Sequence, residues 1–153
     1  MAAVFTTPDL DAVVSEVDIA APPERVFAAL TDAEQCKRWA KGGSCQLTLW
    51  EIDPRPGGKW RFVSRDPASN NYFIHHGAIL EMNPPRLLVY SWFANWHLHP
   101  EQQTVVRWEL TPTATGTKLK VTHSGLAHDA KAREGYRGGW PGLLQHIKLY
   151  FAH

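Results

Sequence analysis

Near its end the chain carries the segment WPGLLQHIKLYF, residues 140–151. Its apolar side chains recur at intervals of three and four residues, the spacing of one face of an α-helix. A helix with one wide apolar stripe has to bury that stripe against another element, so we expect the preceding chain to supply an apolar surface. The stripe consists of Trp140, Leu143, Leu144, Ile147, Tyr150 and Phe151.

The middle of the chain supplies that surface as short segments in which apolar and polar residues alternate. Such alternation is typical of half-buried strands, and Pro-, Gly- and Asn-containing turns separate the segments. Because the turns are short, we expect an antiparallel meander. The pattern therefore predicts an α+β fold, in which a single antiparallel sheet of six or seven strands is covered by the terminal helix. The expected strands span residues 13–20, 46–52, 59–65, 72–82, 87–93, 104–111 and 117–124.

Two short helices are expected after the first strand. Pro23 suits the first turn of one helix, and Asp32 can cap a second helix over residues 33–39. Residues 127–137 are polar and compatible with a helix, and Gly138–Gly139 separate them from the terminal helix. We expect residues 1–12 to form a flexible N-terminal arm and residues 13–153 to form one domain.

Composition excludes several classes of protein. The 153 residues carry 16 basic and 15 acidic side chains, so the net charge of +1 gives no basic excess for binding nucleic acid. We find no apolar run long enough to span a membrane, and no secretory signal at the N-terminus. Two cysteines exclude a disulfide framework and a four-cysteine zinc site. We expect a soluble, cytoplasmic protein.

Five blocks of sequence, in order, resemble one known superfamily. The first is EVDIAAPPERVFAALTDAEQCKRWAKGG at 16–43, and the others are DPRPGGKWRF at 53–62, GAILEMNPPRLLVYSW at 77–92, VRWELTPTATGTKLKVTHSGL at 106–126 and GWPGLLQHIKLY at 139–150. Together they resemble the SRPBCC or START-like superfamily, in its AHSA-type branch, which is named for the activator of the heat-shock protein 90 ATPase. The resemblance implies a helix-grip (Bet v-like) fold, a curved sheet wrapped around a long C-terminal helix. It also implies an elongated cavity between sheet and helix.

Strand alternation places a set of aromatic residues on the face that such a cavity would use. Trp60 and Phe62 share one face of their strand, as do Tyr90 and Trp92 on theirs. These rings could line a ligand cavity or fill the core beneath the helix, and the sequence leaves both alternatives open. The candidate cavity residues are Trp60, Phe62, Tyr90, Trp92, Trp108, His123 and Trp140.

The remaining histidines and cysteines do not form a recognisable catalytic or metal motif. His75 and His76 face opposite sides of a strand, so only one of them can point inward. His97 and His99 share a side, but without a third ligand at a recognisable spacing they are expected to be surface histidines of a loop. Accordingly we expect no metal, no cofactor and no assigned catalytic residue.

Three functions remain open. The leading hypothesis is a non-catalytic protein that binds a hydrophobic or aromatic small molecule in the cavity. A cyclase- or hydratase-like enzyme is the first alternative, with His123 or Tyr90 as acid or base, although the sequence shows no strong partner for either. A co-chaperone-like module that contacts a chaperone ATPase ranks third. A homodimer through an unpaired strand edge is a further hypothesis.

Overall fold

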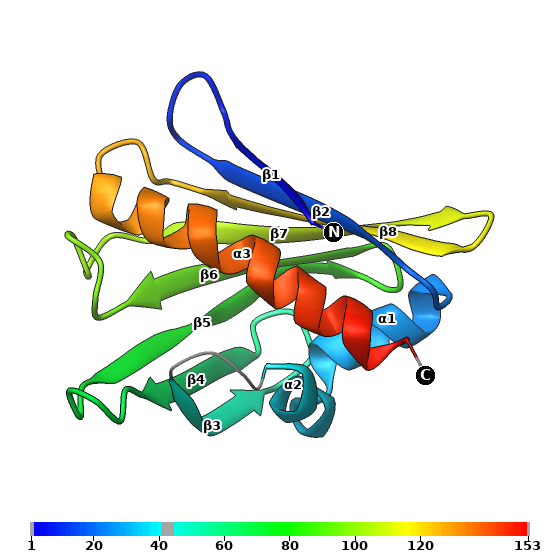
Figure 1. Cartoon of the computed structure of the whole chain (residues 1–153), viewed down its shortest axis with the longest axis horizontal. Helices are drawn as coiled ribbons and strands as arrows, with labels where there is room; N and C mark the ends of the chain where they lie inside the picture. The colour runs from blue at the N-terminus through cyan, green and yellow to red at the C-terminus, as the bar shows by residue number, and fades with distance from the viewer. Residues whose placement is uncertain (1, 41–44, 153) are drawn as a thin grey trace.

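The computed structural model of the protein describes residues 2–40 and 45–152. Within them, eight antiparallel strands form one sheet in the order β1-β2-β8-β7-β6-β5-β4-β3, and a long helix, α3, crosses one face of it (Figure 1). This is the helix-grip arrangement that the sequence predicted. The elements are β1 Ala3–Thr6, β2 Val13–Ile19, α1 Pro23–Thr31, α2 Ala33–Trp39, β3 Gln46–Ile52, β4 Lys59–Arg65, β5 Tyr72–Asn83, β6 Leu87–Ala94, β7 Thr104–Thr113, β8 Gly116–Ser124 and α3 Ala130–Tyr150.

One strand lies in the segment that was expected to be a flexible arm. Residues Ala3–Thr6 form β1, which pairs antiparallel with β2, from Ala3 opposite Glu16 to Thr6 opposite Val13. A strand of four residues is too short to show a clear alternation of apolar and polar side chains. β1 forms because β2 has a free edge with which it can pair. This strand accounts for the difference between the six or seven strands expected and the eight observed.

The two short helices connect strands that lie far apart in the sheet. Pro23 occupies the first turn of α1, and the Asp32 carboxylate caps α2 by accepting a hydrogen bond of 3.2 Å from the backbone N–H of Glu34. Because β2 and β3 are separated by five other strands, α1 and α2 have to cross one end of the sheet. They close that end beside the C-terminus of α3 (Figure 1).

The terminal helix is longer than the sequence indicated. A single helix runs from Ala130 to Tyr150, through the glycine pair and through Pro141. Its buried stripe continues back from Trp140 to Tyr136 and Ala132, one helical turn at a time. Burial of this stripe outweighs the weak helix propensity of the glycines, because most helical stability in proteins comes from packing. None of the helices in the described residues is long and apolar enough to cross a membrane.

The buried stripe makes a direct test of the role of α3. Leu144 is 0% exposed, whereas Leu149 on the same helix is 54% exposed. We expect Leu144→Ala to lower the free energy of unfolding by about 2–5 kcal/mol, since it leaves a cavity in the core. Leu149→Ala, the control, should change it by less than about 0.5 kcal/mol. Urea denaturation followed by circular dichroism measures both, and equal small losses would show that α3 is not the cover of the sheet.

Candidate functional site: a cavity between the sheet and α3

The helix α3 does not cover the sheet evenly. It packs most closely against β2 and β1, while α2 bridges between α3 and β3 at the other side. This leaves a cavity of about 150 Å³ over the part of the sheet that runs from β3 to β7. Six elements contribute to its wall, namely α2, β3, β4, β6, β7 and α3. The lining residues are Trp39, Ala40, Cys45, Leu47, Trp50, Phe62, Ser64, Tyr90, Trp92, Trp108, Trp140 and Leu143.

Aromatic rings in mutual contact build the wall. Phe62 stacks on Trp50 with ring centroids 4.7 Å apart and an interplanar angle of 8°, and Trp39 meets the edge of Trp50 at 5.5 Å. Trp92 lies at the centre, 5.4 Å from Trp140 on the helix. Offset and edge-to-face pairs of this kind add about 0.5–1.5 kcal/mol each beyond the burial of their area. The wall is therefore held by ring contacts that come from distant parts of the sequence.

The indole N–H groups of three of these rings are committed to partners inside the protein. Trp108 donates to the hydroxyl of Tyr90 at 2.7 Å, and Trp92 donates to the hydroxyl of Tyr136 at 2.7 Å. Trp140 donates to Nδ1 of His123 at 3.2 Å. With these donors satisfied, the rings present mainly apolar surface to the cavity.

Five of the seven candidate residues line this cavity. They are Phe62, Tyr90, Trp92, Trp108 and Trp140. The other two, Trp60 and His123, are buried nearby but are not among the lining residues. Contact with a ligand stays a prediction for all seven.

Trp60 lies across the sheet itself. Its strand neighbour is Gly77, where a Cβ atom would overlap the carbonyl oxygen of Ser91 and crowd the indole nitrogen of Trp60. The missing side chain lets the indole cross β5 and donate to that carbonyl oxygen at 3.0 Å. In this position the ring of Trp60 packs against the ring of Trp92, with ring centroids 4.7 Å apart.

His123 acts as a fully bonded core group. Because Nδ1 accepts from Trp140, the ring proton resides on Nε2 and is donated to Oγ1 of Thr104 at 2.8 Å. Thr104 in turn donates to the carbonyl oxygen of Trp92 at 2.8 Å. Burial holds the pKa of His123 well below 6.5, so the ring is neutral. The hydrogen bonds of His123 thus orient Trp140 and the strand beneath Trp92.

Sequence analysis missed several lining residues, and for one of them a signal existed. Residues 46–52 and 59–65 flank a Pro–Gly turn, and a hairpin pairing places Trp50 opposite Phe62, on the same face. Trp39 and Leu143 offered no comparable signal, because their positions depend on how α2 and α3 sit against the sheet. The other lining residues that were missed are Ala40, Cys45, Leu47 and Ser64.

The strand histidines face opposite sides, as expected, but the loop histidines differ from the prediction. His75 points inward and stacks on Phe62 at 4.1 Å, and its Nε2 accepts the N–H of Trp96 at 2.8 Å. His97 was expected at the surface, yet it is only 5% exposed, and its Nε2 lies 2.6 Å from the hydroxyl of Tyr136. The neighbouring residue Trp96 packs against Tyr136 of α3, with ring centroids 5.0 Å apart, and this contact holds the loop against the helix. Within residues 2–40 and 45–152, no three His, Cys, Asp or Glu side chains are grouped to hold a metal ion.

Burial of the inner histidines predicts a pH dependence of stability. Burial, with smaller contributions from His97 and His76, lowers the pKa of His75 from 6.5 to about 3. Between these values the unfolded chain binds a proton that the folded protein does not, so the free energy of unfolding falls as pH falls below 6.5. For His75 alone the loss between pH 7 and pH 5 is about 2 kcal/mol.

The adjacent histidine offers a matched control for this prediction. His75→Gln keeps an acceptor for Trp96 but cannot titrate, so its loss of stability between pH 7 and pH 5 should be smaller than that of the wild type by about 2 kcal/mol. His76→Gln, on the exposed face, should retain the wild-type difference. Urea titrations at the two pH values measure the difference, and identical pH dependence in all three proteins would contradict the assignment.

Comparison with known proteins places this fold in a family. The family model of the Activator of Hsp90 ATPase homolog 1-like protein matches residues 20–152. No curated protein matches the chain.

Among solved structures, a crystal structure from Rhodobacter sphaeroides has a TM-score of 0.84 at 22% identity and covers 99% of this chain and 97% of its own. A solution structure from Arthrobacter aurescens has a TM-score of 0.82 at 17% identity, covering 98% of this chain and 91% of its own. The extent of the family match, together with the helix-grip fold, shows that the chain belongs to the Activator of Hsp90 ATPase homolog 1-like family, the AHSA-type branch of the SRPBCC superfamily.

Proposed function

We propose that this protein binds a small, mainly apolar molecule in the cavity between the sheet and α3. The observation that carries the proposal is the cavity of about 150 Å³, walled largely by aromatic rings from six different elements. Ligand sites are typically concave, mostly apolar and furnished with a few polar groups. Polar groups among the wall residues are the hydroxyls of Ser64 and Tyr90, the thiol of Cys45 and the indole N–H of Trp50, which is buried without a hydrogen-bond partner in the structure.

The size of the cavity limits the ligand. An apolar cavity of about 150 Å³ accommodates one benzene-sized molecule. Burying about 200 Å² of apolar surface contributes roughly 5 kcal/mol, which corresponds to a dissociation constant on the order of 0.1–1 mM. A single aromatic ring is therefore the part of a ligand that the cavity suits.

Binding is better supported than acid–base catalysis. Among the described residues, no carboxylate and no imidazole lines the cavity. Burial raises the pKa of the Tyr90 hydroxyl far above neutrality, so Tyr90 stays protonated. General acid–base catalysis needs a titratable pair within reach of the substrate, with pKa values near the working pH.

The surface gives less support to the co-chaperone alternative. That function would need a contiguous apolar patch outside the cavity. In the described part of the chain, the large apolar side chains that are at least half exposed are spread over β1 and the loop after it, β5, the loop after β6 and α3, and only β5 carries two of them. They are Phe5, Leu10, Tyr72, Leu80, Leu98 and Leu149.

Filling the cavity tests the proposal. Leu143 lines it from α3, so Leu143→Trp should occupy the space, whereas Leu149→Trp on the exposed side of the same helix should not. With toluene at about ten times its dissociation constant, we expect the melting temperature of the wild type and of Leu149→Trp to rise by a few degrees, because the ligand stabilises the folded state by about 1.4 kcal/mol. Leu143→Trp should show no rise. An unchanged melting temperature in the wild type, or an equal rise in Leu143→Trp, would refute binding in this cavity.

A further inference from the structure

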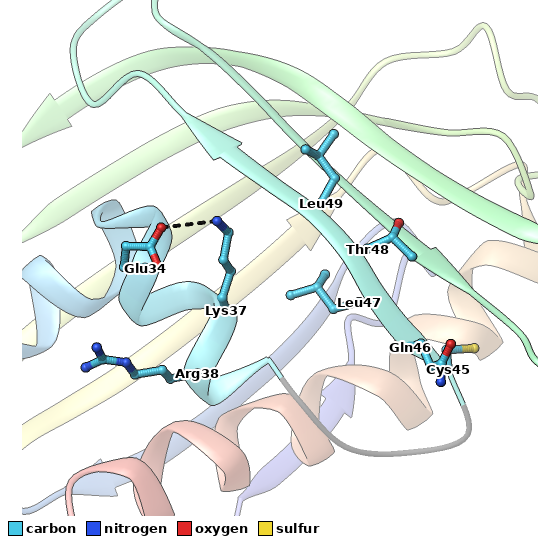
Figure 2. Close-up of a pocket in the computed structure, with 8 residues that line it drawn as sticks. All are labelled: Glu34, Lys37, Arg38, Cys45, Gln46, Leu47, Thr48 and Leu49. Carbon is cyan, nitrogen blue, oxygen red and sulfur yellow. Dashed lines mark hydrogen bonds and ion pairs between the residues drawn. The ribbon is translucent and has the colours of Figure 1, made fainter.

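The inner cavity adjoins a larger groove at the surface. This groove, of about 710 Å³, lies between α2 and β3 (Figure 2). Among the described residues, Cys45 and Leu47 line both spaces, so these two side chains lie where the groove and the cavity adjoin. The groove is also lined by the consecutive residues 45–49 of one chain segment, which places it along the edge of β3 as well as against α2. The groove therefore adjoins the aromatic cavity from the surface side, and we call it the vestibule.

The vestibule carries more positive than negative charge. Lys37 and Arg38 of α2 line it, with Glu34 as the acidic group among its described residues. Figure 2 shows the Lys37 side chain extending alongside the groove toward Glu34, and the two groups form an ion pair of 3.1 Å. Both side chains are well exposed, at 44% and 72%, so this pair is weak and can give way to another carboxylate.

We propose that the ligand is an arylalkyl carboxylate that occupies both spaces. Its ring lies in the aromatic cavity, its short chain passes between Cys45 and Leu47, and its carboxylate accepts a hydrogen bond from the ammonium group of Lys37. The proposal rests on the proposed function, because the ring uses the same cavity. The new elements are the chemical class of the ligand, the side of the protein from which the ligand enters, and Lys37 as the cation that selects the carboxylate.

The ammonium group of Lys37 supplies a charged contact, which the inner cavity lacks among its described lining residues. One apolar ring in a space of this size binds only weakly, and the described lining of the inner cavity holds no charged group. A charge-assisted hydrogen bond at the rim discriminates an acid from a neutral molecule of the same shape. We expect the acid to bind about tenfold more tightly than its amide.

A matched pair of ligands tests the class. 3-Phenylpropanoate and 3-phenylpropanamide share ring, chain length and shape, and differ in charge. Isothermal titration and melting temperature should give the tenfold preference for the acid in the wild type and in Lys131→Gln, an exposed lysine at the start of α3. In Lys37→Gln the two dissociation constants should become equal. Glu34→Gln should instead strengthen the preference, because it removes the carboxylate that competes for Lys37.

The two cysteines provide an independent readout of the route. Cys36 is 0% exposed, and burial raises the pKa of its thiol, whereas Cys45 is partly exposed at the boundary of the two spaces. A disulfide reagent should therefore modify Cys45 first. Saturating 3-phenylpropanoate should slow this reaction at least tenfold in the wild type and should not slow it in Leu143→Trp.

The possible failures are distinct. If neither toluene nor the matched pair stabilises the protein, the proposed function is wrong. If toluene binds but the acid and the amide bind equally, or if Lys37→Gln keeps the preference, the cavity binds a ligand and the carboxylate class is wrong. If the acid binds with the expected preference while Cys45 reacts at an unchanged rate, the route through the vestibule is wrong.

Discussion

Trp92 is the residue on which the arrangement of sheet, helix and cavity depends. It lies near the C-terminal end of β6 and contacts Trp60 of β4 and Trp140 on α3. Its indole N–H is bonded to the hydroxyl of Tyr136, one helical turn before Trp140. A buried N–H without a partner costs about 1–3 kcal/mol, so this bond constrains where α3 can lie on the sheet. The apolar stripe explains why the helix is buried, and the polar atoms of the rings explain why it is buried in one position.

The same bonds account for the cavity. With Tyr136 tied to Trp92 and Trp140 tied to His123, the helix lies toward the β1 and β2 side of the sheet. Among the described residues, no side chain fills the cavity between α2 and the aromatic rings on the far side of the sheet. A cavity lined mainly by aromatic rings offers few polar partners to water, and this favours a mainly apolar occupant. The packing of the core and the wall of the cavity thus involve one set of aromatic residues.

Most of the architecture could be predicted because strands and helices leave a periodic mark on the sequence. Both β3 and β4 begin and end where alternation indicated, and so does α2, whose cap Asp32 is visible in the sequence. Predictions were wrong where packing outweighed local preference. The helix α3 continues through Gly138–Gly139, where the sequence predicted a separation, and His97 is buried because the loop around Trp96 packs onto the helix near Gly135.

The sequence by itself determined the class of fold, the family and the face of each strand on which the aromatic residues lie. Alternation is a local property, and it is sufficient for those conclusions. Only the tertiary structure decided which rings face empty space, because that depends on where α3 and α2 come to rest. His123 and Phe62 both point inward by alternation, yet one is enclosed by its hydrogen bonds to Thr104 and Trp140 while the other lines the cavity. Likewise, the meeting of Lys37 with Cys45 and Leu47 at one groove depends on the contact between α2 and the edge strand β3, which no periodic pattern records.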